Sequence, residues 1–207
     1  MRSGAYSSAA LLAALAFAAC GGGSTRVEVP PELDLTQYQR VALVMFTVEN
    51  AKGSLHELAT ERFAEQMLDA QRIEVLELGD QSWILREAGK RRYGPAEARA
   101  IGKEQGVSAV FFGHMIVSDV KPTASLSNLA RVGAEVDVSL SVRMLATESG
   151  ATLWGSSSEA TGQVAEMVFD GGIPNFGARD PSEAYGELVD GLVYEVTRDM
   201  RPTWVRQ

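Results

Sequence analysis

Cysteine and histidine are scarce in this sequence, which contains one cysteine, Cys20, and two histidines, His56 and His114, among 207 residues. A single thiol forms no intramolecular disulfide and builds no cysteine-ligated metal site. His56 is followed by Glu57 but by no histidine four residues on, so the metalloprotease spacing is missing. Loops of the GxGxxG, GxxxxGK(S/T) and GxSxG types are also absent. We therefore expect no enzyme activity, no metal site and no cofactor.

Basic residues are outnumbered, with 19 Lys and Arg against 27 Asp and Glu, and the formal net charge is −8. Nucleic-acid binding requires clustered basic side chains that neutralise phosphates. The local cluster Lys90-Arg91-Arg92 is interpreted as a solvated helix end rather than a binding patch. The charge balance therefore predicts no nucleic-acid partner.

Long apolar segments are missing after the N-terminal one. Arg2 supplies a positive start, residues 9–19 are almost wholly apolar, and small residues lead into Cys20. Such a segment is too short for a permanent membrane helix and is typical of a secretory signal with a small-residue cleavage site. We expect residues 1–19 to be a signal peptide.

The same segment resembles a bacterial lipoprotein signal, in which cleavage leaves the cysteine as a lipid-bearing N-terminus. The resemblance implies that Cys20 carries acyl chains such as palmitate, which hold the domain on a membrane without a spanning helix. Gly21, rather than an aspartate, follows the cysteine, and by that resemblance favours the periplasmic face of the outer membrane. The alternative is an ordinary exported protein that is cleaved near Ala19.

The composition of residues 20–37 predicts a flexible tether. Gly21-Gly22-Gly23-Ser24 is a flexible sequence, and Pro30-Pro31 stiffens the second half of the segment. Residues 38–207 are enough for a single periplasmic α/β domain.

The first half of this domain alternates strand and helix patterns. Strands are predicted over 41–48, 73–78 and 109–117, and helices over 55–70, 81–90 and 95–106. Ser54 and Glu57 have the spacing of a capping box, while Pro95 and Gly106 suit the start and the left-handed end of the last of these helices. This order is typical of an α/β fold.

The pattern changes at residues 134–146, where apolar residues occupy every second position. Such alternation is typical of a strand with one buried face. Gly150 suits a hairpin turn, and residues 151–161 are predicted to be the return strand. Residues 121–133 and 162–180 are predicted to be long polar connections and candidate contact surfaces.

A terminal helix is predicted to start at the cap Asp180 and to end near Met200, because Pro202 stops it. Together these elements predict an α/β (α+β) fold. Its mixed β-sheet has a long C-terminal antiparallel hairpin and helices packed on the sheet.

The order of these elements resembles one superfamily. Ile101–Val107 leads into Val110–Gly113, and the long alternating strand passes through Thr147–Gly150 to Leu153-Trp154. This layout is similar to the superfamily of the curli secretion channel lipoprotein (CsgG), the lipoprotein activator of penicillin-binding proteins (LpoB) and the N-terminal domain of TolB, over about residues 38–200. The resemblance implies an α/β sandwich-like domain with a role in binding rather than chemistry, and it supplies no catalytic residues.

We therefore expect a lipid-anchored outer-membrane lipoprotein that serves as a non-catalytic protein-binding or assembly module of the cell envelope. Its expected partners are the membrane, through the lipid on Cys20, and an envelope protein (a cell-wall synthase or secretion assembly) or further copies of itself. The alternative is a subunit of an oligomeric export channel of the curli type. Channel members insert extra hairpins, and the sequence has no obvious second alternating hairpin. An enzyme acting on envelope polymers has the least support.

Several polar groups allow two interpretations. His114 lies in an apolar strand, which favours a satisfied sheet histidine over a general base or metal ligand. Asp119, Glu135 and Asp137 could converge on a hard cation, but a solvated strand face explains them better. The alternating strand 134–146 could be half of a membrane hairpin, but it lacks aromatic residues, which favours a soluble sheet.

The three tryptophans, Trp83, Trp154 and Trp204, lie outside the strongest apolar patterns. Exposed tryptophan is enriched in binding hot spots, so a partner surface is one interpretation. Packing at the edge of the core is the favoured one.

Overall fold

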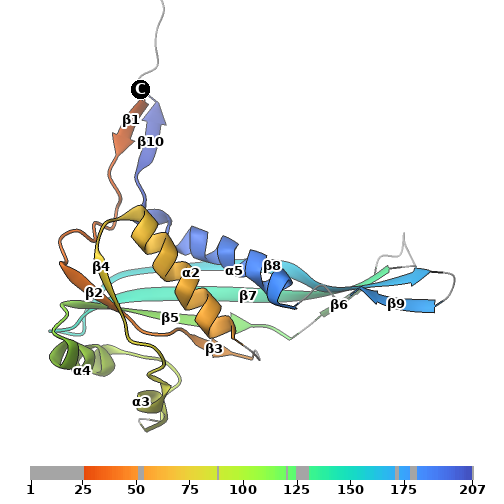
Figure 1. Cartoon of the computed structure of the whole chain (residues 1–207), viewed down its shortest axis with the longest axis horizontal. Helices are drawn as coiled ribbons and strands as arrows, with labels where there is room; N and C mark the ends of the chain where they lie inside the picture. Colours follow the sequence, from red (N-terminus) through yellow and green to blue (C-terminus); the bar gives the residue numbers. More distant parts are fainter. Residues whose placement is uncertain are drawn as a thin grey trace, which may run out of the picture. The chain divides into compact units, whose positions relative to one another are not determined.

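The computed structural model describes residues 26–50, 54–87, 89–119, 121–124, 131–170, 173–177 and 181–206. They belong to two compact units, each described by itself. One is a ribbon in which β1 (Arg26–Val29) pairs in antiparallel fashion with β10 (Thr203–Arg206). The other, residues 30–202, holds the main sheet and the helices (Figure 1). Within the described ranges, every helix is too short or too polar to cross a membrane.

The main sheet has eight strands in the described residues, six of them in the order β4-β2-β5-β7-β8-β9 (Figure 1). β2, β4 and β5 are parallel, and the pairs from β5 to β9 are antiparallel. In addition, β3 pairs with β5 and β6 pairs with β7. The bounds are β2 Arg40–Leu43, β3 Thr47–Glu49, β4 Glu74–Glu77, β5 Ala109–Val117, β6 Lys121–Ala124, β7 Arg131–Ala146, β8 Thr152–Asp170 and β9 Ile173–Gly177.

Helices cover both faces of the parallel part of the sheet. Their bounds are α2 Leu55–Ala70, α3 Ser82–Glu87, α4 Pro95–Gln105 and α5 Pro181–Val196, followed by the 3₁₀ turn η1 Arg198–Met200. Val41 and Leu43 pack with α2 and α5, whereas Ala42 and Val44 pack with α3 and α4. Because side chains alternate along a strand, β2 is buried on both faces. The predicted fold class, a mixed sheet with a long antiparallel hairpin and helices packed on it, is confirmed.

The predicted strand 41–48 is divided in the structure, so its prediction as one strand is wrong. β2 ends at Leu43, which lies opposite Phe111, and β3 begins at Thr47, which lies opposite His114. Three residues between these pairs face only two on β5, so the chain must bulge away from the ladder.

The bulge is stabilised at Phe46. Its backbone N–H donates a hydrogen bond to Oγ1 of Thr60 at 2.9 Å, instead of to a strand. Its ring lies on the backbone of Gly113, where an added Cβ would come within 2.3 Å of ring atoms. A residue with a side chain at position 113 would therefore displace the ring.

The helix ends agree only in part with the predicted caps. At Ser54 the backbone has φ −96° and ψ 25°, and its side chain makes no capping hydrogen bond, so the capping box with Glu57 is wrong. A capping residue needs extended backbone to aim its oxygen at the first-turn amides. For α4, the Gly94 N–H donates to Oε2 of Glu97 at 2.8 Å, and Gly106 ends the helix at φ 67°, as predicted.

The β7–β8 hairpin is longer than predicted, and a second hairpin follows it. The expected connections 121–133 and 162–180 contain β6, the start of β7, the end of β8 and all of β9, so their prediction as loops is wrong. Backbone pairing defines these strands, and their short or Gly- and Pro-containing sequences leave little trace in hydrophobic periodicity. Within them, residues 125–130, 171–172 and 178–180, including the predicted cap Asp180, lie outside the described residues.

The turn after β7 agrees with the sequence, whereas the start of the packed unit and the end of α5 differ from it. Gly150 adopts φ 76°, as predicted, and donates its N–H to the carbonyl of Ala146 at 2.8 Å.

Inside the predicted tether, Leu35 is fully buried, and its N–H donates to Oε1 of Gln71 at 2.6 Å. Leu33 belongs to the same core, so the packed unit begins before residue 38. α5 ends at Val196, earlier than the predicted end near Met200.

We predict that Gly113→Ala destabilises the domain, because the added methyl group overlaps the Phe46 ring. The expected loss in the free energy of unfolding is about 1–3 kcal/mol, measured by urea denaturation. Gly155→Ala is the matched control, because its Cβ would meet the nearest side-chain atom at 3.6 Å and should change stability by only about 0.5 kcal/mol. Equal stability of the two variants would contradict the close packing at Gly113.

Candidate functional site

A pocket lies where the connections that follow β2 and β4 separate. After β2 the chain passes through α2 on one face of the sheet, and after β4 it passes through α3 and α4 on the other face. In open α/β sheets, such a reversal leaves a crevice at the carboxyl ends of the strands. The pocket has a volume of about 540 Å³. It is lined by residues that follow β2, open α2, follow β4 and precede α4: Met45, Phe46, Thr47, Val48, Glu49, Asn50, Leu55, His56, Asp80, Ser82, Arg91 and Tyr93.

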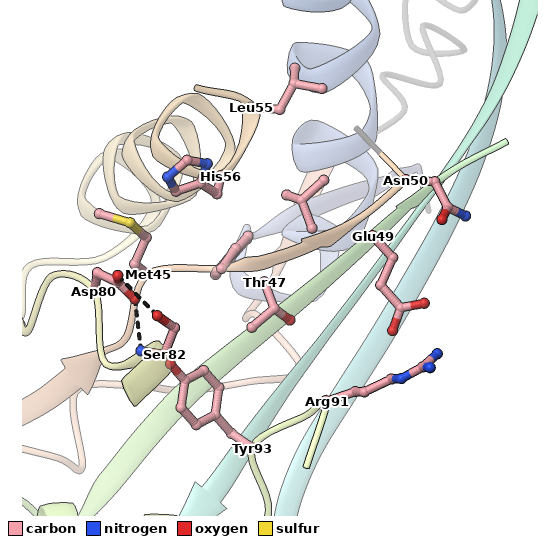
Figure 2. A pocket seen from close by; sticks show the side chains of 12 residues that line it. Met45, Thr47, Glu49, Asn50, Leu55, His56, Asp80, Ser82, Arg91 and Tyr93 are labelled. Atoms are coloured by element: carbon pink, nitrogen blue, oxygen red, sulfur yellow. Dashed lines mark hydrogen bonds between the residues drawn. The ribbon is translucent and has the colours of Figure 1, made fainter. Parts of the chain in front are cut away.

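Charged and polar side chains gather at two places in this pocket. Figure 2 shows Glu49 and Arg91 toward one side, and His56, Asp80 and Ser82 toward the other. Both signs of charge are therefore present. The lining is suited to hydrogen bonding with a small polar group rather than to an apolar ligand.

Asp80 is already engaged by the chain itself. Its carboxylate accepts hydrogen bonds from the Ser82 N–H at 2.7 Å and from the Ser82 hydroxyl at 3.0 Å (Figure 2). These bonds, the backbone one first, lower the pKa of Asp80. Burial raises the pKa of the neighbouring Tyr93 to about 12, so its phenol stays protonated. Neither group is arranged as a general acid or base for neutral pH.

His114 lies beside the pocket, on β5. Its Nδ1 is 2.7 Å from Oγ1 of Thr47, and its Nε2 is 3.5 Å from Oε1 of Glu49. The imidazole is about nine-tenths buried, and within the described residues its Nε2 has no hydrogen-bond partner. The expectation of a fully satisfied sheet histidine therefore holds for one ring nitrogen only.

The environment of His114 favours the neutral ring. Burial lowers the pKa of His114, and the guanidinium groups of Arg92 and Arg143 lower it further. The carboxylate of Glu49 opposes them. The Arg143 side chain is held in place by a 3.0 Å hydrogen bond from Nη2 to the carbonyl of Tyr93.

A hydroxyl, an imidazole and a carboxylate lie next to one another in space at Thr47, His114 and Glu49. This is the order of groups found in nucleophilic triads. The cavity at His114 has a volume of only about 30 Å³, room for little more than water. The Thr47 hydroxyl also lies within 3.3 Å of the Gly113 carbonyl as a hydrogen-bond donor. Thr47 also lines the larger pocket, but its hydroxyl is already engaged with the imidazole and with this carbonyl.

The sequence did not point to Glu49, Asp80 or Arg91 as neighbours. Glu49 follows the predicted strand 41–48, Asp80 follows the predicted strand 73–78, and Arg91 precedes the predicted helix 95–106. The usable signal was that Glu49 and Asp80 each follow a strand that runs in the same direction, since carboxyl ends of parallel strands share one edge. In the cluster Lys90-Arg91-Arg92, Lys90 pairs with Glu97 at 2.5 Å, while Arg91 lines the pocket.

The sequence allowed a hard-cation site at Asp119, Glu135 and Asp137, but Asp137 is engaged by a cation and a hydroxyl of its own chain. Asp137 accepts hydrogen bonds from Lys121 at 2.5 Å and from Thr161 at 2.7 Å, and the Lys121 bond is the main cause of its lowered pKa. A search of the described residues finds no group of three or more metal-binding side chains there. Asp137 therefore belongs to a solvated strand face, the favoured interpretation.

The tryptophans differ from one another. Trp154 packs edge-on against Phe111, with ring centroids 6.1 Å apart, and its Nε1 donates to Oδ2 of Asp199 at 3.2 Å. Edge packing is therefore confirmed for Trp154. Trp83 in α3 is 50% exposed and Trp204 in β10 is 61% exposed, so edge packing is wrong for both.

The outer edge of β8 is the second candidate surface. β7 pairs with β8 almost throughout, but β9 pairs only with Glu166–Asp170. Among the described strands, none pairs with the outer edge of β8 between Thr152 and Ala165. Backbone donors and acceptors along such an edge can bind an additional strand.

Two irregularities bound this edge. In the register with β7, Leu153 and Val164 are each an extra residue on β8. The ten residues between them, Trp154–Gln163, form a regular strand without lysine or proline, the residues that commonly protect edges. Its exposed side chains are polar: Ser157, Glu159, Thr161 and Gln163.

Comparisons with known proteins were made at three levels. No protein-family profile matches the sequence, and no curated protein matches it. Among solved structures, a PelC dodecamer from Paraburkholderia phytofirmans is similar over 86% of this chain and 97% of that one, with 13% identity and a TM-score of 0.47.

Two further similar structures are a lipoprotein and a domain of LpoB. The lipoprotein GNA1162 from Neisseria meningitidis is similar over 60% of this chain and 83% of that one, with 13% identity and a TM-score of 0.38. The LpoB C-terminal domain from Salmonella enterica is similar over 72% of this chain and 93% of that one, with 12% identity and a TM-score of 0.37. At these values the likeness concerns the fold alone.

We predict that His114 titrates below the ordinary histidine pKa of 6.5. Removal of a neighbouring carboxylate and removal of a neighbouring cation should shift its pKa in opposite directions. Glu49→Gln should lower the pKa of His114 further, because it removes a stabilising carboxylate. Arg92→Gln should raise it. Imidazole proton shifts in NMR titrations measure both changes, and shifts of the same sign would contradict the arrangement.

The same burial makes stability depend on pH. The unfolded chain binds a proton near pH 6.5, whereas the folded chain does so only at lower pH. The contribution of neutral His114 to the free energy of unfolding is therefore complete above pH 6.5, and it is lost as the pH falls toward the pKa of His114 in the folded chain. Urea denaturation at several pH values should show a weaker dependence in His114→Gln.

Proposed function

We propose that this protein is a lipid-anchored lipoprotein on the periplasmic face of the outer membrane, where it acts as a non-catalytic binding and assembly module. The N-terminal sequence supports the anchor, because a short apolar segment ends in small residues and the only cysteine. Cys20 itself lies outside the described residues. The observation that carries the binding role is the regular edge of β8, Trp154–Gln163, with which no other described strand pairs.

Addition of a partner's strand would pair the backbone groups of this edge, with which no other described strand pairs. An incoming strand gains backbone hydrogen bonds along β8, and the polar side chains of the exposed face give it register. The partner is an envelope protein that contributes an extended segment, such as one from a cell-wall synthase or a secretion assembly. The pocket beside β2 is separate from this edge in sequence, since its lining residues lie between positions 45 and 93.

The second candidate is a subunit of an oligomeric channel. One observation favours it: in the described residues, β4 has an open outer edge at the opposite end of the strand order from β8 and β9. Pairing of β4 with β8 of a neighbouring copy is heterologous, and such contacts close into rings when the rotation permits. Native mass spectrometry of the detergent-extracted protein decides between the two, because only a channel subunit gives a large closed ring.

We predict that Cys20→Ser abolishes acylation and releases the protein from membranes of a two-membrane bacterium. The physical reason is that acyl chains contribute about 0.8 kcal/mol per buried methylene. Mass spectrometry of the N-terminal peptide and membrane fractionation measure the result. Gly21→Asp is the matched control, which should keep the lipid but move the protein to the inner membrane. Native protein that lacks acyl chains and washes off membranes would disprove the anchor.

We predict that Ser157→Lys weakens partner binding through β8, since an edge lysine opposes strand addition. Ser141→Lys is the matched control, because Ser141 lies directly opposite on β7, which is paired on both sides. A photo-crosslinker at Thr161 should capture one defined partner or a second copy in the native and Ser141→Lys proteins, and roughly tenfold less in Ser157→Lys. Equal capture in all three would rule out the β8 edge.

A further inference from the structure

The β1–β10 ribbon exposes an unusual share of the apolar surface. All eight of its residues are exposed. Of the eight large apolar side chains that are exposed in the described part of the chain, four belong to this ribbon: Val27 38%, Val29 38%, Trp204 61% and Val205 44%. Isolated two-stranded ribbons are only marginally stable in water. A surface of this kind therefore needs a partner that covers it.

The two faces of the ribbon differ in chemistry. Directly opposite residues in an antiparallel pair share a face, so Val27, Val205 and Val29 lie on one face with Thr203. Arg26, Arg206, Glu28 and Trp204 share the other face. One face is thus largely aliphatic, and the other combines two cations with an indole.

Arg26 lies directly opposite Arg206. Like charges in this position destabilise a strand pair unless an anion lies between them. Guanidinium groups bind phosphate with two parallel hydrogen bonds, so a phosphate would relieve the repulsion. The ribbon carries one carboxylate, Glu28, and its formal charge is +1, although the whole chain is acidic.

The sequence places this end of the ribbon close to the proposed anchor. Arg26 comes six positions after Cys20, and a chain of that length reaches at most about 20 Å. This step rests on the proposed acylation of Cys20. An acylated cysteine lies at the membrane surface, where phosphate headgroups, interfacial tryptophan and basic side chains are commonly found together.

We propose that the β1–β10 ribbon is a second membrane contact, which binds the headgroup region of a phospholipid bilayer. The face that carries Arg26, Arg206 and Trp204 lies on the bilayer, so that the two guanidinium groups bind lipid phosphate and the indole lies at headgroup depth. The acyl chains on Cys20 hold the protein at the bilayer, and such a contact limits the orientations of the anchored protein.

The first test uses the mature chain from residue 20 with Cys20→Ser, so that no acyl chain contributes. Co-sedimentation with phosphatidylcholine vesicles that contain phosphatidylglycerol should detect binding. Trp204→Ala should weaken binding roughly tenfold, since it removes the large exposed indole from the proposed contact. Trp83→Ala is the matched control and should bind like the parent, because its indole is 50% exposed but belongs to α3.

The second test separates the charge from the apolar contact. The double variant Arg26→Gln and Arg206→Gln should lose the preference for phosphatidylglycerol and bind vesicles with and without this lipid roughly equally. Brominated acyl chains should quench the tryptophan fluorescence of the Trp83→Ala protein but not of the Trp204→Ala protein.

The outcomes distinguish this proposal from the proposed function. Acylated native protein whose Trp204 escapes bromolipid quenching would overturn the ribbon contact and leave the anchor intact. Native protein without acyl chains would overturn the anchor, while vesicle binding of the Cys20→Ser chain still decides the ribbon. Self-association without vesicles that depends on Trp204 would assign the ribbon to a second copy and overturn the membrane contact.

Discussion

The burial of β2 on both faces is the constraint on which the rest of the main unit depends. Val41 and Leu43 pack on one layer of helices, and Ala42 and Val44 pack on the other. This strand lies inside the sheet, with parallel neighbours on both sides, and the helices that follow β2 and β4 pack on opposite faces. The crevice at its carboxyl end results from that arrangement, because neither connection can cover it.

The same constraint explains the neighbourhood of His114. The bulge after β2 moves Phe46 over Gly113, and the chain then rejoins β5 one residue out of step. That shift sets Thr47 against the imidazole and leaves Glu49 at 3.5 Å from its free nitrogen. A polar group thus becomes buried beside a pocket without being fully paired, which proteins tolerate at few positions.

Much of the first half of the domain was predictable, because each element there carries its own burial pattern. Residues 109–117 form a strand with the predicted bounds, and the left-handed cap at Gly106 lies where it was expected. The division of 41–48 was not predictable, since a uniformly apolar sequence has no period that reveals a bulge. Residues 162–170 were missed for another reason: their pairing is made by backbone groups, whatever their side chains.

The candidate site was less predictable than the fold. Its polar residues lie on four separate segments, and only the crossing of the connections brings them together. Sequence patterns report on local burial, whereas Glu49, Asp80 and Arg91 line the same pocket through topology. The sequence predicted contact surfaces at 121–133 and 162–180, whereas most of the open β8 edge lies before residue 162, because its position depends on how far β9 extends along β8.

The two extra residues of β8 have a consequence for any strand that joins it. A strand held between Leu153 and Val164 cannot slide past either irregularity without losing its hydrogen-bond alignment. The regular part of the edge therefore has a fixed length of about 33 Å, at ~3.3 Å for each of ten residues. Under the proposed strand addition, segments that fit this interval would gain a full set of bonds and longer ones would turn away at its ends, so that length itself would be a criterion of recognition.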